Sequence, residues 1–332
     1  MAAGYGSDLI VDLLKLLGID YVALNPGSSF RGIHDSLVNY SGGKPEIVLC
    51  CHEEIAVSLA HGYAKAAGKP MAAIVHNVVG LQHASMAIYN AWCDRAPILV
   101  LGGTGPMNSA RRRPWIDWIH TALVQGNLVR DFVKWDDQPV GVEAIPSSIL
   151  RGHRIATSDP KGPVYLCFDV TDQEAKLEKE IALPDPARFR PPAPLQAESE
   201  TIKEAARLLA AAEHPVILAD YVGRNNQAVL ALVELAELLA APVVDLGARL
   251  NFPNTHPLNL TGKNRELIVG ADVILGLDVM DLYGALSRSD PATHLSTPAT
   301  KPGCKVIHAT LADLATRGWT SDFQELAPVD LP

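Results

Sequence analysis

The sequence lacks the features that mark several large classes of protein. No apolar run reaches the roughly 18 residues that a membrane span needs, and the first residues lack the basic start and apolar stretch of an export signal. Lys and Arg total 28 against 37 Asp and Glu, a formal net charge of -9, which disfavours nucleic acid or an anionic membrane as a partner. The one basic run, Arg111 to Arg113, is too short to change that prediction.

Cysteine is also scarce. The five cysteines form an odd set without metal-ligand spacing, and Cys50 and Cys51 are adjacent in an apolar run. This disfavours a disulfide framework or a zinc site, and we predict a protein of the reducing cytoplasm without metal ligands of its own.

What the sequence does have is a repeated alternation of short apolar runs and segments with helical periodicity. Because near-continuous apolar strands separated by helices indicate a parallel sheet, we predict an α/β fold. The predicted strands are 21–24, 46–51 (buried), 71–75, 98–102, 164–168, 216–219, 243–246, 273–277 and 305–309, and the predicted helices are 9–17, 52–67, 84–93, 147–156, 199–212 and 227–239.

The composition changes once along the chain. From about Val170 the sequence becomes charged and then proline-rich, which is typical of an exposed connector. We therefore predict two doubly wound domains with mainly parallel sheets: a first domain at 1–172, a linker at 173–194 and a second domain at 195–332.

Three loops that follow predicted strands are candidates for a site, because open parallel sheets bind ligands at the carboxyl ends of their strands. They are 25–29 (Asn-Pro-Gly-Ser-Ser), 52–54 (His-Glu-Glu) and 76–80 (His-Asn-Val-Val-Gly). Each also has an ordinary structural explanation. Pro-Gly forms turns, acidic residues complement the start of a helix, and a histidine closing a strand is commonly a satisfied polar group.

The ordered set of motifs is more specific than any one loop. It resembles the pyrimidine-binding domain of thiamine-diphosphate enzymes of the acetolactate synthase and benzoylformate decarboxylase type, and then the middle domain of that family, which is Rossmann-like. The motifs are Glu53, Gly62-Tyr63-Ala64, Gly68-Lys69-Pro70, the 76–80 loop, Asn90-Ala91-Trp92, Ala96-Pro97-Ile98 and 161–166 in the first domain, and Ala241-Pro242-Val243, Asn251-Phe252-Pro253 and His256-Pro257 in the second.

The resemblance implies roles for particular residues. By its register relative to Gly62, Glu53 rather than Glu54 is the carboxyl that bonds N1′ of the cofactor's aminopyrimidine and activates it. Ser28 and His76 match a serine and a histidine on the substrate side of the pocket. We therefore expect catalytic roles for Glu53, His76 and Ser28, and cofactor contacts from Glu53, Pro26, Gly27, Asn77, Gly80 and His83.

The sequence departs from the family pattern at two places that bear on which reaction the protein catalyses. His83 stands where the family normally has an asparagine, and the stretch 278–285 has no counterpart of a second pocket histidine of the decarboxylases. The 76–80 loop itself resembles the decarboxylase branch. Decarboxylation and carboligation of a 2-keto acid both stay open.

The family's diphosphate motif, Gly-Asp-Gly with a later Asn-Asn pair that binds Mg²⁺, does not occur in the sequence. We expect thiamine diphosphate as cofactor, with Mg²⁺ held through a separate partner subunit in a heterotetramer. A non-catalytic scaffold or regulatory subunit is the alternative. A nicotinamide-dependent dehydrogenase is disfavoured because no glycine fingerprint follows the first strand, and flavin is not expected. Trp115, Trp118 and His120 are expected either to pack an irregular loop or to form a subunit contact.

Overall fold

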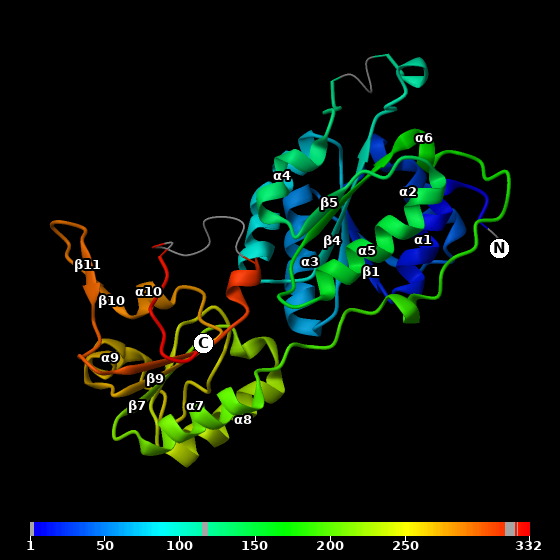
Figure 1. Cartoon of the computed structure of the whole chain (residues 1–332). Helices are drawn as coiled ribbons and strands as arrows, with labels where there is room; N and C mark the ends of the chain where they lie inside the picture. Colours follow the sequence, from blue (N-terminus) through cyan, green and yellow to red (C-terminus); the bar gives the residue numbers. More distant parts are fainter. Residues whose placement is uncertain (1–2, 115–118, 316–322, 324) are drawn as a thin grey trace. The chain divides into compact units, whose positions relative to one another are not determined.

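A computed structural model describes residues 3–114, 119–315, 323 and 325–332. The chain forms two compact units, Met1–Pro194 and Leu195–Pro332, which are described separately (Figure 1). Trp115 and Trp118, two of the residues expected in a loop or a subunit contact, lie outside the described residues. None of the described helices combines the length and the apolar character that crossing a membrane requires.

A parallel six-stranded sheet forms the centre of the first unit. Its order is β2–β1–β3–β4–β6–β5, with the bounds β1 Tyr21–Leu24, β2 Glu46–Leu49, β3 Met71–Val75, β4 Ile98–Thr104, β5 Trp135–Asp137 and β6 Val164–Asp169. The predicted α/β class with a parallel sheet is confirmed. The short strand β5 was not predicted, because its sequence, Trp-Asp-Asp, lacks an apolar run.

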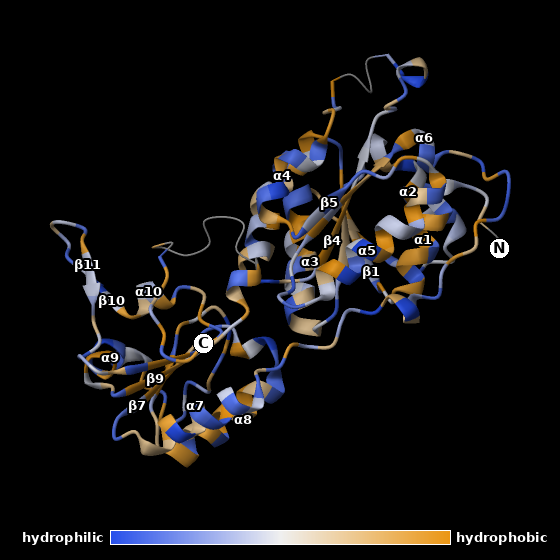
Figure 2. Ribbon diagram, viewed as in Figure 1, coloured by the Kyte–Doolittle hydropathy of each residue, from blue (hydrophilic) through white to orange (hydrophobic). Residues whose placement is uncertain are grey.

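Helices cover both faces of this sheet. They are α1 Gly6–Leu16, α2 Arg31–Asp35, α3 Glu53–Ala67, α4 Val79–Cys93, α5 Ile145–Thr157 and α6 Val170–Gln173. Alternate residues of β3 belong to different cores: Ala72 and Ile74 pack with α1 and α5, whereas Met71, Ala73 and Val75 pack with α3 and α4. Figure 2 shows the apolar strands between the helices, and the two apolar layers explain why the central strands read as continuous apolar runs.

The strand β2 differs from its prediction. We expected a buried strand at 46–51, but β2 ends at Leu49; Glu46 and Leu49 are exposed and the two residues between them are half-buried. It lies at the edge of the sheet and pairs only with β1, so that no second neighbour covers it. Composition alone could not separate this edge strand from a central one.

Two helices of the first unit show how local signals succeed and fail. Helix α3 begins after His52, whose ring accepts the Glu54 N–H, and it ends at Gly68 in the left-handed conformation. Helix α4 was predicted from residue 84, yet it begins at Val79. The N–H of Val78 is bonded by the side chain of Gln125, which is remote in sequence, so no local capping signal marks this start.

The segment predicted as an exposed connector, 173–194, is grouped with the first unit. Gln173 is fully buried, and Leu177, Ile181 and Leu183 pack against the core on the α1 and α5 side. The charged and proline-rich composition gave no indication of these contacts.

The second unit contains a parallel four-stranded sheet in the order β12–β9–β7–β8, with apolar cores on both faces. Its strands are β7 Pro215–Ala219, β8 Val243–Asp245, β9 Val273–Leu277 and β12 Lys305–Ala309; its helices are α7 Ser199–Ala211, α8 Asn226–Leu239, α9 Asn264–Gly270 and α10 Leu282–Ala285. A small antiparallel hairpin, β10 Ser287–Ser289 with β11 Ser296–Pro298, was not predicted. This arrangement matches the predicted second doubly wound domain.

Candidate functional site

The three predicted loops follow β1, β2 and β3, which are neighbours in the sheet of the first unit. Since these strands are parallel, their carboxyl ends share one edge. The loops therefore meet, and contacts between Gly27 and His76 and between Glu53 and Gly80 join them.

Glu53 is a buried carboxyl at the first position of α3, only 5% exposed, whereas Glu54 is exposed. The backbone of Gly80 lies against it, and a Cβ at that position would stand 2.8 Å from Oε1 and 3.1 Å from Cγ of Glu53. The two adjacent acidic residues thus have different surroundings, and only Glu53 faces the loop after β3.

His76 closes β3 and is held by a residue that the sequence did not single out. Its Nδ1 lies 2.8 Å from Oγ of Ser29, and the same Oγ accepts the N–H of Asn77 at 3.0 Å. Because Oγ has a second lone pair, it can also accept from an Nδ1–H; in that tautomer Nε2 carries no proton and can accept one. Burial, and secondarily the neighbouring His120, lower the pKa of His76, although Glu53 acts in the opposite direction.

Ser28, the predicted catalytic serine, is exposed in the short 3-10 helix η1, Ser28–Phe30. Its neighbour Ser29 is 5% exposed and makes the contact with His76. The resemblance predicted Ser28 for the substrate side of the pocket, and that role stays a prediction. The contact of Ser29 with His76 was not predicted, because it depends on the direction of a single turn.

The other predicted cofactor residues fall into three groups. Gly27 and Gly80 permit close approach, since a Cβ on Gly27 would stand 2.9 Å from the His76 ring. Asn77 is buried, and its Oδ1 has no hydrogen-bond partner among the described residues. Pro26 and His83 are exposed at the rim.

Gln125 is a further residue that sequence reasoning missed. It is fully buried; its Oε1 accepts the Val78 N–H at 2.5 Å, and its Nε2 donates to the Gly103 carbonyl at 2.9 Å. It therefore ties the 76–80 loop to β4. A glutamine inside a segment without periodicity carries no signal of such a role.

Two histidine rings stack beside Glu53. The His52 and His83 rings lie with centroids 4.8 Å apart and planes 15° apart, and His83 Nδ1 is 3.8 Å from Oε2 of Glu53. His83 occupies the position where the resemblance predicted an asparagine. The substitution places a second imidazole next to the buried carboxyl.

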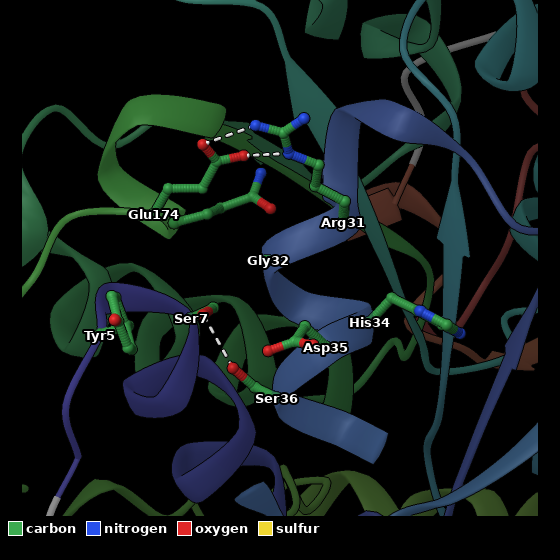
Figure 3. Close-up of a pocket in the computed structure, with 9 residues that line it drawn as sticks. Tyr5, Ser7, Arg31, Gly32, His34, Asp35, Ser36 and Glu174 are labelled. Carbon is green, nitrogen blue, oxygen red and sulfur yellow. Dashed lines mark hydrogen bonds and ion pairs between the residues drawn. The ribbon is translucent and has the colours of Figure 1, made fainter. Parts of the chain in front are cut away.

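A cavity of about 440 Å³ lies elsewhere in the first unit. Figure 3 shows it between Tyr5 and Ser7 on one side and Arg31, His34 and Asp35 on another, with Arg31 paired to Glu174.

Gln173 also lines this cavity. Its Nε2 donates to the Ser29 carbonyl at 2.9 Å. The wall of the cavity is thereby connected to the loop that holds His76.

Comparisons with known proteins agree with the resemblance. The family model described as "Thiamine pyrophosphate enzyme, N-terminal TPP binding domain" matches residues 5–127, and "Thiamine pyrophosphate enzyme, central domain" matches residues 202–310. The chain is 26% identical over 315 residues to the acetolactate synthase large subunit of Haemophilus influenzae, covering 91% of this chain and 52% of that protein. It is 27% identical over 282 residues to the benzoylformate decarboxylase of Pseudomonas aeruginosa, covering 80% of this chain and 50% of that protein.

Solved structures show the same fold. A thiamin diphosphate-dependent enzyme from Mycobacterium smegmatis, whose own assignment is provisional, superposes with a TM-score of 0.74 at 22% identity, covering 93% of this chain and 57% of that one. A 4-hydroxybenzoylformate decarboxylase from Rhodococcus jostii superposes with a TM-score of 0.74 at 24% identity, covering 92% and 56%. The chain spans about half the length of the curated relatives that it matches.

Proposed function

The chain belongs to the thiamine pyrophosphate enzyme family, and we propose that it provides the carboxyl group that activates the cofactor. The observation that carries this proposal is the buried Glu53 at the start of α3, facing the Gly80 backbone. The whole enzyme would be a decarboxylase or a carboligase acting on a 2-keto acid.

The residues present fit an aminopyrimidine. A ring with nitrogen acceptors and an amino donor needs a carboxyl group that can hold a proton and an acceptor for the amino group. Glu53 offers the first. The buried Oδ1 of Asn77, which has no partner within the part of the chain that the structure describes, is a candidate for the second. Gly27 and Gly80 let the loops pack closely against His76 and Glu53, which holds these two side chains side by side at the strand ends.

Bound thiamine diphosphate supplies a carbon nucleophile for the keto group and accepts the electrons released on decarboxylation. The task of Glu53 is to hold a proton at its carboxyl and share it with the pyrimidine ring nitrogen. Glu53 is buried, and the Gly80 backbone covers its carboxyl group. The exposed Glu54 lacks that environment, so we assign the role to Glu53 alone.

We propose that His76 exchanges a proton with the substrate. Its lowered pKa keeps the ring neutral near pH 7, so that it can accept a proton on one occasion and return it on another. Ser29 orients the ring through Nδ1, which leaves Nε2 for the substrate. Ser28, exposed in the same loop, is proposed to contact the substrate from the solvent side.

We further propose that a separate polypeptide binds the diphosphate and Mg²⁺, in a heterotetramer located in the cytoplasm. The 332 residues hold the predicted activating loop and contain no Gly-Asp-Gly motif. Apolar side chains stand exposed on α3 and α4, with Ile55 51%, Val79 36% and Met86 55% exposed, and they offer a contact surface next to Glu53.

The substrate class follows from the relatives' names only in outline. Acetolactate synthase and benzoylformate decarboxylase differ in the fate of the same kind of intermediate, and the chain resembles both at similar identity. We propose a small 2-keto acid as substrate, with release of carbon dioxide as the shared first outcome.

Purification of the tagged chain from its source organism tests the proposal. We expect a companion polypeptide that bears Gly-Asp-Gly, and we expect the pair to release carbon dioxide from pyruvate or benzoylformate when thiamine diphosphate and Mg²⁺ are added. A pair that forms but turns over neither these nor other 2-keto acids would favour the scaffold alternative. A chain that copurifies with no such companion would refute the separate-subunit proposal.

A further inference from the structure

Among the described residues, one cluster has the composition of a transition-metal site: His52, Glu53 and His83. Each can offer one ligand atom, and these atoms all lie within 4.8 Å of one another. A set of two imidazoles and one carboxylate suits Zn²⁺ better than Mg²⁺ or Ca²⁺, which bind oxygen ligands. Three protein ligands with one open coordination position are typical of catalytic zinc sites, whereas structural zinc sites have four protein ligands. We propose that Zn²⁺ or a similar divalent transition metal binds His52, Glu53 and His83.

The position of the cluster gives the ion a favourable charge environment. Glu53 is the buried anchor, with a side chain only 7% exposed, and its negative charge offsets part of the metal's charge. His83 lies at the mouth with a side chain 59% exposed, so an ion can reach the carboxylate from solvent past this ring. The site is thus half-open and needs no separate entry path.

A modest rearrangement completes the coordination. Ligands at about 2.0–2.2 Å from a tetrahedral Zn²⁺ stand about 3.3–3.5 Å apart, which is closer than the largest separation in the cluster. The exposed His83 ring must move closer to Oε2 of Glu53, which lies 3.8 Å from its Nδ1. The two stacked rings must also tilt apart so that their nitrogens converge on one point.

His52 provides a signature of binding. Its Nδ1 accepts the Glu54 N–H at 3.2 Å, so the neutral ring carries its proton on Nε2. Coordination through Nδ1 replaces the Glu54 N–H, and coordination through Nε2 shifts the proton to Nδ1; either ends this bond. Metal binding therefore releases the N-terminal cap of α3.

The consequence for activity rests on the proposed function. A carboxylate bound to a metal cannot hold the proton that the cofactor's pyrimidine requires. The metal and the cofactor would then compete for Glu53, and transition metals would inhibit the enzyme without displacing Mg²⁺ from its own site.

Titration of the isolated chain with Co²⁺ tests the site without any activity measurement. We expect saturable binding with the visible absorption bands of four-coordinate cobalt, loss of these bands on addition of Zn²⁺, and no loss with Mg²⁺. His83→Asn should weaken Co²⁺ binding by more than about 100-fold, since loss of a ligand exceeds the 10–100-fold effect of losing an outer-shell partner. His294→Asn, an exposed histidine in the second unit, is the matched control and should leave binding unchanged.

A second readout distinguishes this site from metal bound elsewhere. In the amide NMR spectrum, Zn²⁺ should shift the Glu54 N–H in the wild type but not in His52→Asn or His83→Asn. Absence of saturable Co²⁺ binding, or equal affinity in wild type and His83→Asn, would overturn the proposal. If the metal binds as described while the enzyme pair shows no thiamine-dependent turnover, the site stands and the proposed function fails.

Discussion

Gly80→Ala perturbs the close contact of Gly80 with Glu53 and His76, on which the candidate site depends. The added Cβ would stand 2.8 Å from Oε1 of Glu53 and 2.9 Å from Cβ of His76, and the second atom cannot swing away as a side-chain tip can. Overpacking of this kind costs about 1–3 kcal/mol. Alanine regains up to about 1 kcal/mol in a helix, so we expect a net loss of about 0–2 kcal/mol in the free energy of unfolding.

Gly62→Ala is the matched control. Gly62 lies in α3, and a Cβ added there would meet no atom within 4 Å, so alanine should stabilise the chain by about 0.5–1 kcal/mol. Urea unfolding of both variants should therefore show a difference of roughly 1–3 kcal/mol between them. Activity with the partner should fall only in Gly80→Ala. Equal stabilisation by the two alanines would refute the close approach of Gly80 to Glu53 and His76.

Three further predictions concern the same unit. Ser29→Ala removes the hydroxyl that bonds His76 Nδ1, so it should lower kcat with a smaller effect on KM and should shift the His76 ring resonances in NMR. Ser28→Ala should leave these resonances unchanged; the opposite result would reverse the assignment of the two serines. Because the pKa of His76 is below its ordinary 6.5 in the folded chain, the unfolded chain binds more protons below that pH. Stability should be intact above about pH 6.5 and fall as the pH drops through the folded-state pKa, and His76→Gln should flatten part of that fall; an unchanged pH profile would contradict it. Burial raises the pKa of Cys167 to about 12, so iodoacetamide should label the exposed Cys51 and spare Cys167 in the native chain, as mass spectrometry of the peptides would show.

The sequence predicted most of the fold because its main strands are short apolar runs with helices between them. The bounds of β1, β3, β9 and β12 agree with the structure to the residue. The failures occur where a distant group decides the local structure. Helix α4 begins five residues before its predicted start. The side chain of Gln125, remote in sequence, bonds the N–H of the N-cap residue Val78, and the residues around Val79 carry no sequence signal of that bond.

The candidate site, like the fold, could be predicted only in part from the sequence. Register against Gly62 predicted Glu53 rather than Glu54 as the activating residue, and the structure buries the first and exposes the second. Ser29 and Gln125 were out of reach, because their roles depend on which loops meet across the sheet edge rather than on spacing along the chain.

We propose that Glu53 activates the cofactor. The most direct test of this proposal compares Glu53→Gln with Glu54→Gln in the purified pair of polypeptides, with thiamine diphosphate and Mg²⁺ present and carbon dioxide release from a 2-keto acid as the readout. The two substitutions are the same change at adjacent positions, and circular dichroism checks that both variants fold. We expect Glu53→Gln to abolish turnover and Glu54→Gln to retain it. Full activity in Glu53→Gln, or equal loss in both variants, would contradict the account.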